Sequence, residues 1–233
     1  MIEELQEHFE KEYPREACGV IAIVKGKKKW FACTNVAEDD TDFILCSNEY
    51  LDIKKKYDII GIVHNHTDGS NEPSENDINN CNALGIPYYI FSYPDMELNV
   101  VEPKQRQHPL IGREYKFGIQ DCFEAIRDYL KTKNISLPPR APFEDDWWKK
   151  EGLNYFCPDI IQQWGGKEIL SPQENDVLIF TVDAEVPNHC GVYIGNDTFF
   201  HHAVSRLSCR EHLYPFWIKY LTGVYRYDAN NLS

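Results

Sequence analysis

A short apolar run that ends in two histidines constrains the first half of the chain more than any other feature. Residues 59–63 read IIGIV, and a β-branched apolar run of this length predicts a buried strand. Because side chains alternate along a strand, His64 and His66 should emerge on one side at its carboxyl end. After a polar loop, Ser74 opens a predicted helix that carries Asp77 one turn inside. Two imidazoles and one carboxylate leave a fourth position open for water, as a catalytic zinc requires.

Each part of this pattern also has an ordinary structural interpretation. A His-x-His pair is often only a polar strand end, and Ser-x-x-Asp is often only a helix cap. The combination at this spacing favours a metal site. Glu16, at the mouth of a second apolar strand over residues 19–24, is a candidate base. Nothing in the local sequence decides between that role and an ordinary surface glutamate.

The candidate base, the candidate ligands and the helix start together resemble the motif of the JAMM (MPN-type) metalloproteases. The motif residues in this chain are Glu16, His64, His66, Ser74 and Asp77. The resemblance covers roughly residues 1–100. It implies that His64, His66 and Asp77 bind Zn²⁺. It also implies that Glu16 takes a proton from the attacking water and that Ser74 helps to hold the oxyanion. Family members usually have proline after the second histidine, where this chain has Thr67. That difference concerns the rigidity of the loop and not a ligand.

Length and charge favour two domains over one. The chain has 233 residues, of which 42% are hydrophobic, enough for two packed cores. Before Gln105 there are 20 acidic and 10 basic residues, a net charge of −10, and from there on 17 and 14, a net charge of −3. The total of −13 argues against nucleic acid or an anionic membrane as the main partner.

The first residues predict an amphipathic helix and no signal peptide. The stretch MIEELQEHFEKEY is acidic where a signal peptide is basic. Ile2, Leu5, Phe9 and Tyr13 fall on one helical face. No run approaches the ~18 apolar residues of a membrane span. We therefore expect synthesis in the cytoplasm without an export signal, and the eight cysteines, which form no C-x-x-C pair, should be free thiols.

A polar segment with a proline near each end, residues 102–109, predicts a linker to a second domain. Beyond it, Asp121 is a good N-cap and Cys122 would be the first residue of the helix. A thiol there feels the positive end of the helix dipole, which lowers its pKa and favours the thiolate. Cys122 is therefore a candidate nucleophile.

The last third of the chain predicts successive antiparallel strands that carry histidines, over residues 175–182, 189–195 and 198–204. A tight turn joins the last two strands, so His189 and His201 should lie within reach of each other. His189 would then accept the Cys122 proton, and His201 would orient His189. Taken singly, each residue is more often a buried thiol or a polar strand edge, but the combination favours a catalytic site.

Three segments of this half resemble the NlpC-type cell-wall cysteine peptidases of the papain-like group, over about residues 110–230: DCFEAIRDYL, NDVLIF and NHCGVYIGNDTFFHHAVSRLSCR. The resemblance implies that Cys122 is the nucleophile, His189 the base and His201 the third polar residue. Many members have a single histidine before alanine at the last motif, so His202 stays an alternative for the third role. Residues 144–156 should form an inserted helical cover, in which Trp147, Trp148 and Phe156 pack or line a groove.

The predicted fold is α+β in two domains. Residues 1–104 should form a mixed sheet with flanking helices, and residues 105–233 a helix packed on an antiparallel sheet. This domain pair is similar to that of tail-tip assembly proteins of long-tailed bacteriophages. The similarity implies hydrolysis of stem-peptide amides in peptidoglycan, a second zinc-dependent amide or isopeptide hydrolase, and partners among other phage tail-tip proteins. The alternative is a structural tail-tip or hub-binding module whose sites are vestigial.

Overall fold

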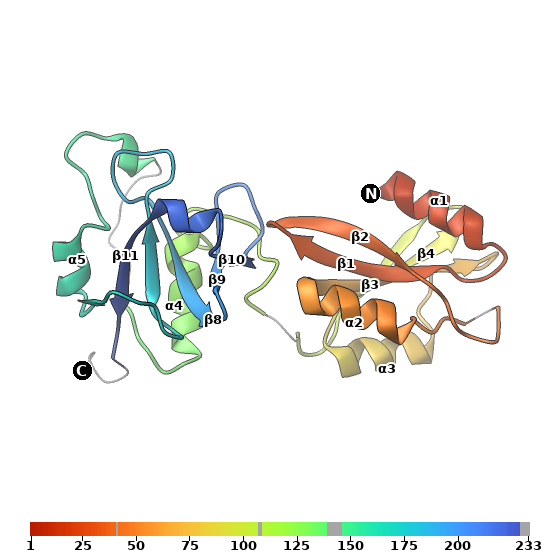
Figure 1. Cartoon of the computed structure of the whole chain (residues 1–233). Coiled ribbons are helices and arrows are strands. Elements are labelled where there is room, and N and C mark those ends of the chain that lie inside the picture. The colour runs from red at the N-terminus through yellow and green to blue at the C-terminus, as the bar shows by residue number, and fades with distance from the viewer. Residues whose placement is uncertain (41, 107–108, 139–145, 229–233) are drawn as a thin grey trace. The chain divides into compact units, whose positions relative to one another are not determined.

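The computed structural model describes residues 1–40, 42–106, 109–138 and 146–228. These residues form two compact units, Met1–Ile111 and Gly112–Ser233 (Figure 1). The described part of each unit contains one sheet with its own hydrophobic core. A mixed sheet in the first unit and an antiparallel sheet in the second confirm the predicted α+β class.

The described residues of the first unit form a five-stranded sheet in the order β2-β1-β3-β4-β5. Its strands are β1 (Cys18–Val24), β2 (Lys27–Cys33), β3 (Asp58–Thr67), β4 (Tyr88–Tyr93) and β5 (Leu98–Val101). Only β3 and β4 pair in parallel among them, and the other described neighbours are antiparallel. A parallel pair needs a crossover, and α3 (Glu75–Leu84) supplies it.

Helices cover both faces of this sheet (Figure 1): α1 (Ile2–Glu12) lies on one face, and α2 (Ser47–Lys56) and α3 lie on the other. Leu5 and Phe9 of α1 are buried, as the helical spacing predicts. Ile2 and Tyr13 are about half exposed, and the prediction that Tyr13 belongs to the helix is wrong. The reason is that Ile2 stands in the first turn and that α1 ends at Glu12, before Tyr13.

The second unit has a six-stranded sheet in its described part, in the order β10-β9-β8-β7-β11-β6. The strands are β6 (Lys167–Glu168), β7 (Val177–Phe180), β8 (His189–Gly195), β9 (Thr198–His201), β10 (Cys209–His212) and β11 (Leu221–Arg226), and every described pairing is antiparallel. Strand β7 is shorter than the predicted residues 175–182. Asn175 has a left-handed backbone, and the Val182 amide bonds the side chain of Asn188 instead of a neighbouring strand.

Helix α4 (Cys122–Lys131) packs on this second sheet, mainly against β8 and β9. Phe123, Ile126 and Leu130 of α4 share a core with residues of β7 and β8. The opposite face of the sheet packs against Trp217, in the 3₁₀ helix η2 (Trp217–Tyr220). The smaller elements are α5 (Pro158–Gln163) and the 3₁₀ helix η1 (Trp147–Lys149).

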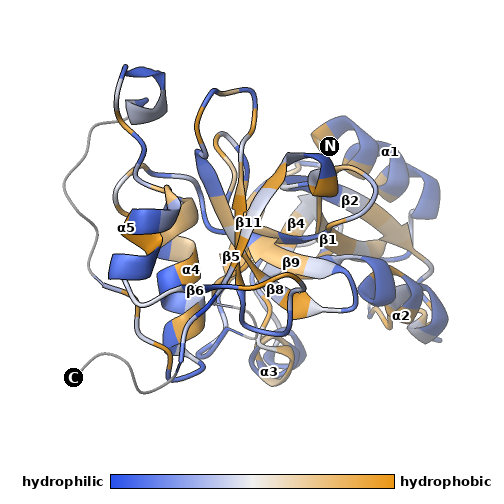
Figure 2. Cartoon of the chain, turned by 60° about the vertical axis from the view of Figure 1, so that its left-hand side comes forward, coloured by the Kyte–Doolittle hydropathy of each residue, from blue (hydrophilic) through white to orange (hydrophobic). Residues whose placement is uncertain are grey.

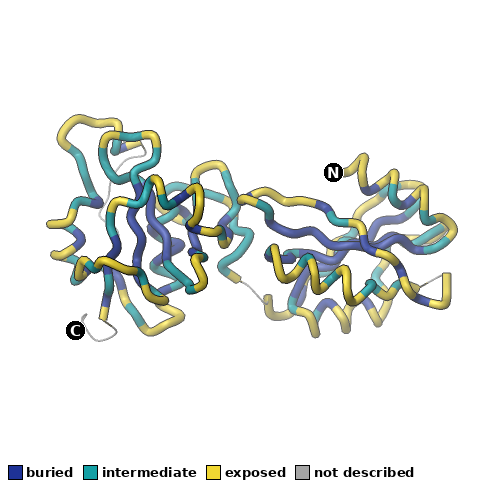
Figure 3. Tube along the Cα trace, viewed as in Figure 1, coloured by how far each residue is buried: buried dark blue, intermediate teal, exposed yellow. Residues whose placement is uncertain are grey.

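Burial and hydropathy follow this layered arrangement. Figure 3 shows buried residues concentrated in the central strands of both sheets, and many exposed residues along α1, α2 and α3. Figure 2 shows α1 and α2 as mostly hydrophilic and the strands of the second sheet as more hydrophobic. All eight cysteines are free, as predicted. Among the described residues, no helix combines the length and apolar character that a bilayer crossing requires.

The predicted helical cover is only partly a helix. Residues 144 and 145 lie outside the described residues, as do 107 and 108 of the predicted linker. The described part of the cover contains the single 3₁₀ turn η1, followed by irregular chain. Trp147 and Phe156 are buried in the core, so packing is one of their roles.

Candidate active sites

Three side chains of types that can bind a metal meet where β3 approaches the start of α3. The Nε2 atoms of His64 and His66 are 3.2 Å apart. Asp77 Oδ1 lies 3.2 Å from His64 Nε2, and Asp77 Oδ2 lies 3.6 Å from His66 Nε2. Alternation along β3 therefore brings both rings to one side, as predicted. Both histidines lie within β3 and not after its end, because its parallel pairing with β4 continues to Thr67.

The residues at the start of α3 cap the helix and also position the Asp77 carboxylate. Ser74 Oγ accepts a hydrogen bond from the Asp77 amide at 3.1 Å. Asp77 Oδ2 in turn accepts from the Ser74 amide at 2.8 Å and from Ser74 Oγ at 2.7 Å. This reciprocal capping box holds the carboxylate in place. The capping and ligand interpretations of Ser-x-x-Asp are thus compatible.

The chemistry of this donor set fits Zn²⁺. His66 Nδ1 lies 2.8 Å from the Ser70 carbonyl oxygen, which only accepts, so Nδ1 carries the hydrogen. Neutral His66 then presents a lone pair on Nε2 to His64 and Asp77. Electron-pair donors that converge in a buried site are costly unless a cation satisfies them. These three residues form one of two groups among the described residues with ligand atoms within 4.8 Å of one another.

The titration behaviour of the cluster reflects its burial and its internal hydrogen bonds. Burial lowers the pKa of His64, and the hydrogen bond that protonated His66 donates to Asp77 raises the pKa of His66. Burial opposes ionisation of Asp77, but hydrogen bonds with the two imidazoles hold its pKa far below the ordinary range. At neutral pH the Asp77 carboxylate is therefore an anion that attracts a cation.

Glu16 is a buried carboxylate held beside this cluster, and not an ordinary surface residue. Its side chain is buried, and burial raises the pKa of Glu16 to about 7, with His66 opposing and Asp77 adding to the shift. Asn35 Nδ2 donates to the Glu16 carbonyl oxygen at 2.8 Å. Asn65, between the two histidines, accepts from the Ala17 amide at 2.8 Å. A carboxylate with a pKa near neutrality suits a general base.

The second site begins at the N-terminus of α4. Asp121 is the N-cap, as predicted, and its Oδ1 accepts from the amides of Phe123 and Glu124 at 3.1 Å each. Cys122 is the first residue of the helix and is half-buried. Hydrogen bonding to Cys190 and to His189 lowers the pKa of Cys122 well below that of an ordinary thiol, against the effect of burial. A lowered thiol pKa favours ionisation to the thiolate, which is the reactive form of a cysteine.

Two histidines on neighbouring strands, His189 on β8 and His201 on β9, form a hydrogen-bonded array with this thiol. His189 Nε2 lies 2.9 Å from His201 Nδ1, so His189 Nδ1 is the nitrogen left for Cys122. Burial lowers the pKa of both histidines. Gly191 is the residue directly opposite His201, so His189 reaches His201 along a diagonal of the β8–β9 pair. His202 instead directs its Nε2 at the carbonyl oxygen of Arg206, at 3.1 Å.

Two further side chains, which were not predicted from the sequence, lie next to His201: those of Glu211 and Cys209. His201 Nε2 lies 3.4 Å from Glu211 Oε1 and 3.8 Å from Cys209 Sγ. Trp217 Nε1 donates to Glu211 Oε2 at 2.9 Å. Glu211 and Cys209 were missed because no strand was predicted for residues 209–212. Their period-two spacing in the sequence CREH was the available signal, since it places both on one face of a strand.

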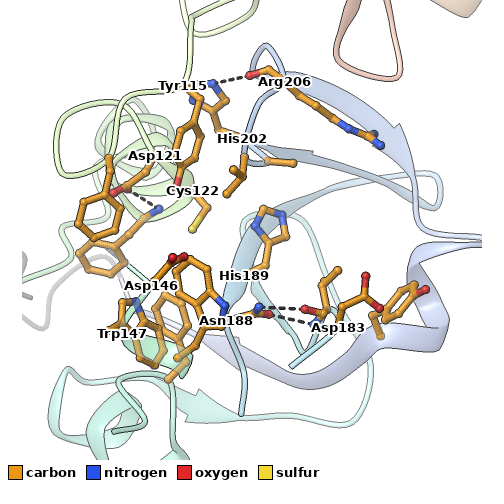
Figure 4. A pocket seen from close by; sticks show the side chains of 18 of the residues that line it. Tyr115, Asp121, Cys122, Asp146, Trp147, Asp183, Asn188, His189, His202 and Arg206 are labelled. Carbon is orange, nitrogen blue, oxygen red and sulfur yellow. Dashed lines mark hydrogen bonds between the residues drawn. The ribbon is translucent and has the colours of Figure 1, made fainter. Parts of the chain in front are cut away.

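The thiol opens into a pocket of ≈530 Å³ within the second unit. Figure 4 shows Cys122 pointing toward His189, with Trp147 and Asn188 to one side and Tyr115 and His202 to the other. The Phe, Tyr and Trp side chains that line it come from several segments: Tyr115, Phe117, Phe123, Trp147, Trp148, Phe156, Phe216, Trp217 and Tyr220. Trp147, Trp148 and Phe156 thus both line the groove and contribute to packing. The pocket also has charged walls of both signs: Asp121, Asp146, Asp183, Lys149 and Arg206.

Comparison with known proteins gives two family matches. Residues 1–104 match the family of prokaryotic homologs of the JAB domain, and residues 112–226 match the NlpC/P60 family. Among solved structures, a lipoprotein-like NLP/P60 family protein of Staphylococcus aureus is 21% identical to this chain, with a TM-score of 0.37. That match covers 51% of this chain and 38% of the other.

Two relatives match most of the chain. Tail tip assembly protein K of Escherichia phage N15 is 30% identical over 229 residues, which are 97% of this chain and 93% of that protein. Tail tip assembly protein K of Escherichia phage lambda is 27% identical over 183 residues, 78% of this chain and 88% of that protein. The similarity to the phage N15 protein thus spans both units.

Proposed function

The chain belongs to the family of tail tip assembly protein K, and from that premise we propose that it acts at the tip of a bacteriophage tail as a peptidoglycan hydrolase. Its partners there are other tail-tip proteins and the stem peptides of the cell wall. In this proposal residues 105–233 carry the thiol peptidase and residues 1–104 a zinc-dependent amide hydrolase. The observation that carries it is the array of Cys122, His189 and His201, in which Cys122 and His189 line an aromatic pocket and His201 lies buried against His189.

The proposed thiol reaction proceeds in two steps. His189 takes the proton of Cys122, and the thiolate attacks the carbonyl carbon of a stem-peptide amide. His189 then returns that proton to the leaving amine, and a thioester remains on Cys122. In the second step His189 takes a proton from water, which attacks the thioester and releases the carboxylic acid. The thiol regains its proton from His189, and His201 keeps His189 oriented throughout.

Oxyanion stabilisation in this reaction is assigned to the start of α4. The Asp121 side chain occupies the amides of Phe123 and Glu124. The Cys122 amide, which precedes them, is the group that we assign to the developing oxyanion. A backbone N–H in this position is already oriented before the substrate binds, so it costs no reorganisation during the reaction.

For the N-terminal unit we propose that His64, His66 and Asp77 hold Zn²⁺. When bound, the metal would supply a Lewis acid that polarises an amide carbonyl. Glu16 takes a proton from the attacking water, a role supported by a pKa of about 7. Ser74 positions Asp77 through its hydroxyl, and its proposed contact with the oxyanion requires that hydroxyl to turn away from Asp77. The substrate in this proposal is an amide or isopeptide.

The test is to incubate the full chain with purified peptidoglycan and to identify the released fragments by mass spectrometry. We expect wild type and His66→Ala to release the same stem-peptide fragments and Cys122→Ala to release none. Cleavage that survives Cys122→Ala contradicts the assignment. Absence of cleavage by the wild-type protein, together with full infectivity of phage that carry Cys122→Ala or His66→Ala, favours the structural tail-tip module with vestigial sites.

A further inference from the structure

We propose that Glu211 is a positioning residue of the thiol site. It determines which ring nitrogen of His201, and through it which ring nitrogen of His189, carries the hydrogen. The inference rests on the proposed thiol peptidase and adds a fourth member to its array. Glu211 stands on β10, and β10 pairs with β9 so that Cys209 lies opposite His201. Glu211 therefore approaches His201 from the side that faces away from His189 and the pocket.

Glu211 is surrounded by donors. Trp217 Nε1 donates to its Oε2 at 2.9 Å, and an Arg206 guanidinium nitrogen lies 3.4 Å from its Oε1. Cys209 Sγ lies 3.8 Å from the same oxygen. Burial raises the pKa of Glu211, but the bonds with His201 and Trp217 outweigh it and lower the pKa to about 2. At neutral pH Glu211 is a carboxylate, and it can only accept hydrogen bonds.

An acceptor at this point decides which nitrogen of each imidazole carries the hydrogen. His201 Nε2, 3.4 Å from Glu211 Oε1, must be N–H, because a lone pair there would face a negative oxygen. In neutral His201, Nδ1 is then the acceptor. His189 Nε2, 2.9 Å away, must therefore donate. That leaves the lone pair of His189 on Nδ1, toward Cys122, where a base needs it.

The opposite pair of tautomers would prevent His189 from acting as a base. If His201 carried its hydrogen on Nδ1, it would donate to His189 Nε2, and neutral His189 would carry its own hydrogen on Nδ1. That hydrogen would point at Cys122, and His189 would be unable to take the thiol proton. A carboxylate two imidazoles away from the thiol therefore selects the tautomer that catalysis requires. Without that selection, both orders satisfy the hydrogen bond between the histidines equally.

The same groups include a possible metal-ligand set, since His201, Cys209 and Glu211 have ligand atoms within 4.8 Å of one another. The charges around Glu211 favour its role in fixing the histidine tautomers over a role in binding a metal. The guanidinium of Arg206 is already 3.4 Å from Glu211 and would repel a cation placed there. An ion on His201 Nε2 would also force the hydrogen onto His201 Nδ1, which gives the wrong order for His189.

The direct test is to read the tautomers by ¹⁵N NMR of the histidines in the full chain near neutral pH. We expect the Nε2–H form of His189 in wild type. In Glu211→Gln, whose amide can donate to His201 Nε2, we expect a shift toward the Nδ1–H form. Glu168→Gln, an exposed change on β6, is the matched control and should leave the wild-type form. An unchanged His189 tautomer in Glu211→Gln overturns the proposal.

A second measurement needs no substrate and separates this proposal from the proposed function. Alkylation of Cys122 by iodoacetamide, followed by mass spectrometry across pH, reports the thiolate. Glu211→Gln should move its midpoint upward by about one pH unit, and Glu211→Asp, which keeps the charge, should restore most of the change. If Glu211→Gln fails to fold, Glu211→Asp is compared with wild type by NMR, and a His189 tautomer outside the Nε2–H form contradicts the proposal. Normal tautomers and alkylation without peptidoglycan cleavage would contradict only the hydrolase function.

Discussion

Gly191 lies directly opposite His201 in the β8–β9 pair, and its lack of a side chain leaves room for the Phe199 ring, the Phe200 carbonyl oxygen and the Cβ of His201. A Cβ at position 191 would lie 3.2 Å from His201 Cβ and 2.7 Å from the Phe199 ring. The position of the third member of the array therefore depends on a residue without chemistry of its own.

Gly191→Ala should lower thiol activity by displacing His201. We expect a loss of about tenfold or more in peptidoglycan cleavage and ~1–3 kcal/mol in the free energy of unfolding, as for other overpacked sites. Gly69→Ala is the control, because its Cβ would meet only ordinary contacts in the first unit. Equal cleavage by Gly191→Ala and wild type, measured by mass spectrometry of released fragments, would refute this dependence.

Substitution of the zinc ligands should remove the metal without touching the thiol. Purified wild type should contain about one zinc per chain, measured by plasma mass spectrometry after dialysis, and His66→Ala or Asp77→Asn should contain almost none. Cys122→Ala and His212→Ala should keep it, because both residues belong to the second unit. Full zinc content in His66→Ala is the result that would rule out this ligand set.

Ser74→Ala should weaken the metal site and the helix together, because one hydroxyl caps α3 and holds Asp77. We expect a loss of ~1 kcal/mol in the free energy of unfolding from the cap and of roughly 10- to 100-fold in zinc affinity. Ser74→Thr keeps a hydroxyl and should retain most of both. Zinc titration with a competing chelator, together with thermal unfolding, measures the two effects. A zinc affinity unchanged in Ser74→Ala would separate the cap from the metal site.

Cys122 should be alkylated first among the half-buried cysteines at about pH 6–7, since its pKa is lowered well below that of an ordinary thiol. Quantitative mass spectrometry of iodoacetamide-treated protein compares Cys122 with Cys46 and Cys157. His189→Ala removes one of the groups that lower the pKa of Cys122, so alkylation should then require a higher pH. Equal rates for the three cysteines in wild type would count against an activated thiol.

Acid should destabilise the second unit partly through Glu211. Its folded-state pKa of about 2 lies below its ordinary 4.5, so this contribution is complete above about pH 4.5 and is lost as the pH falls toward about 2. The lowering corresponds to at most ~3 kcal/mol. Four of the five tryptophans lie in the second unit, so denaturant unfolding followed by their fluorescence measures it. Glu211→Gln should show a shallower decline over this pH range than wild type, and parallel declines would refute the contribution.

Local sequence patterns predicted those parts of the two sites whose structure depends on residues close together in the sequence. The apolar run before His64 and the period-two spacing to His66 specify their strand, and Ser74 and Asp121 are caps with a local mechanism. The tight turn at Gly195 fixes the hairpin that brings His189 and His201 together. Their catalytic and metal-binding roles stay predictions.

The rest depends on contacts between distant segments. Glu211 and Trp217 reach His189 and His201 through the β9–β10 pairing and a 3₁₀ turn, and β10 is a strand of four residues with mixed burial. In a strand this short, the period-two spacing of Cys209 and Glu211 is too brief a signal to predict a strand by itself. Asn35 supports Glu16 across 19 residues of sequence, and no local rule connects them.

Asn65 is the middle residue of the His-x-His motif, and its bond to the Ala17 amide ties β3 to the residue that follows Glu16. If β3 slipped by one residue against β1, both imidazoles would turn to the opposite face of the sheet and an amide side chain would take their place. The slip would also break the bond of Asn65 to the Ala17 amide. The hydrogen bond of Asn65 therefore helps to fix the register in which Glu16, His64 and His66 face one another. We expect that replacing Asn65 would disturb the geometry of this cluster although none of its own residues is changed.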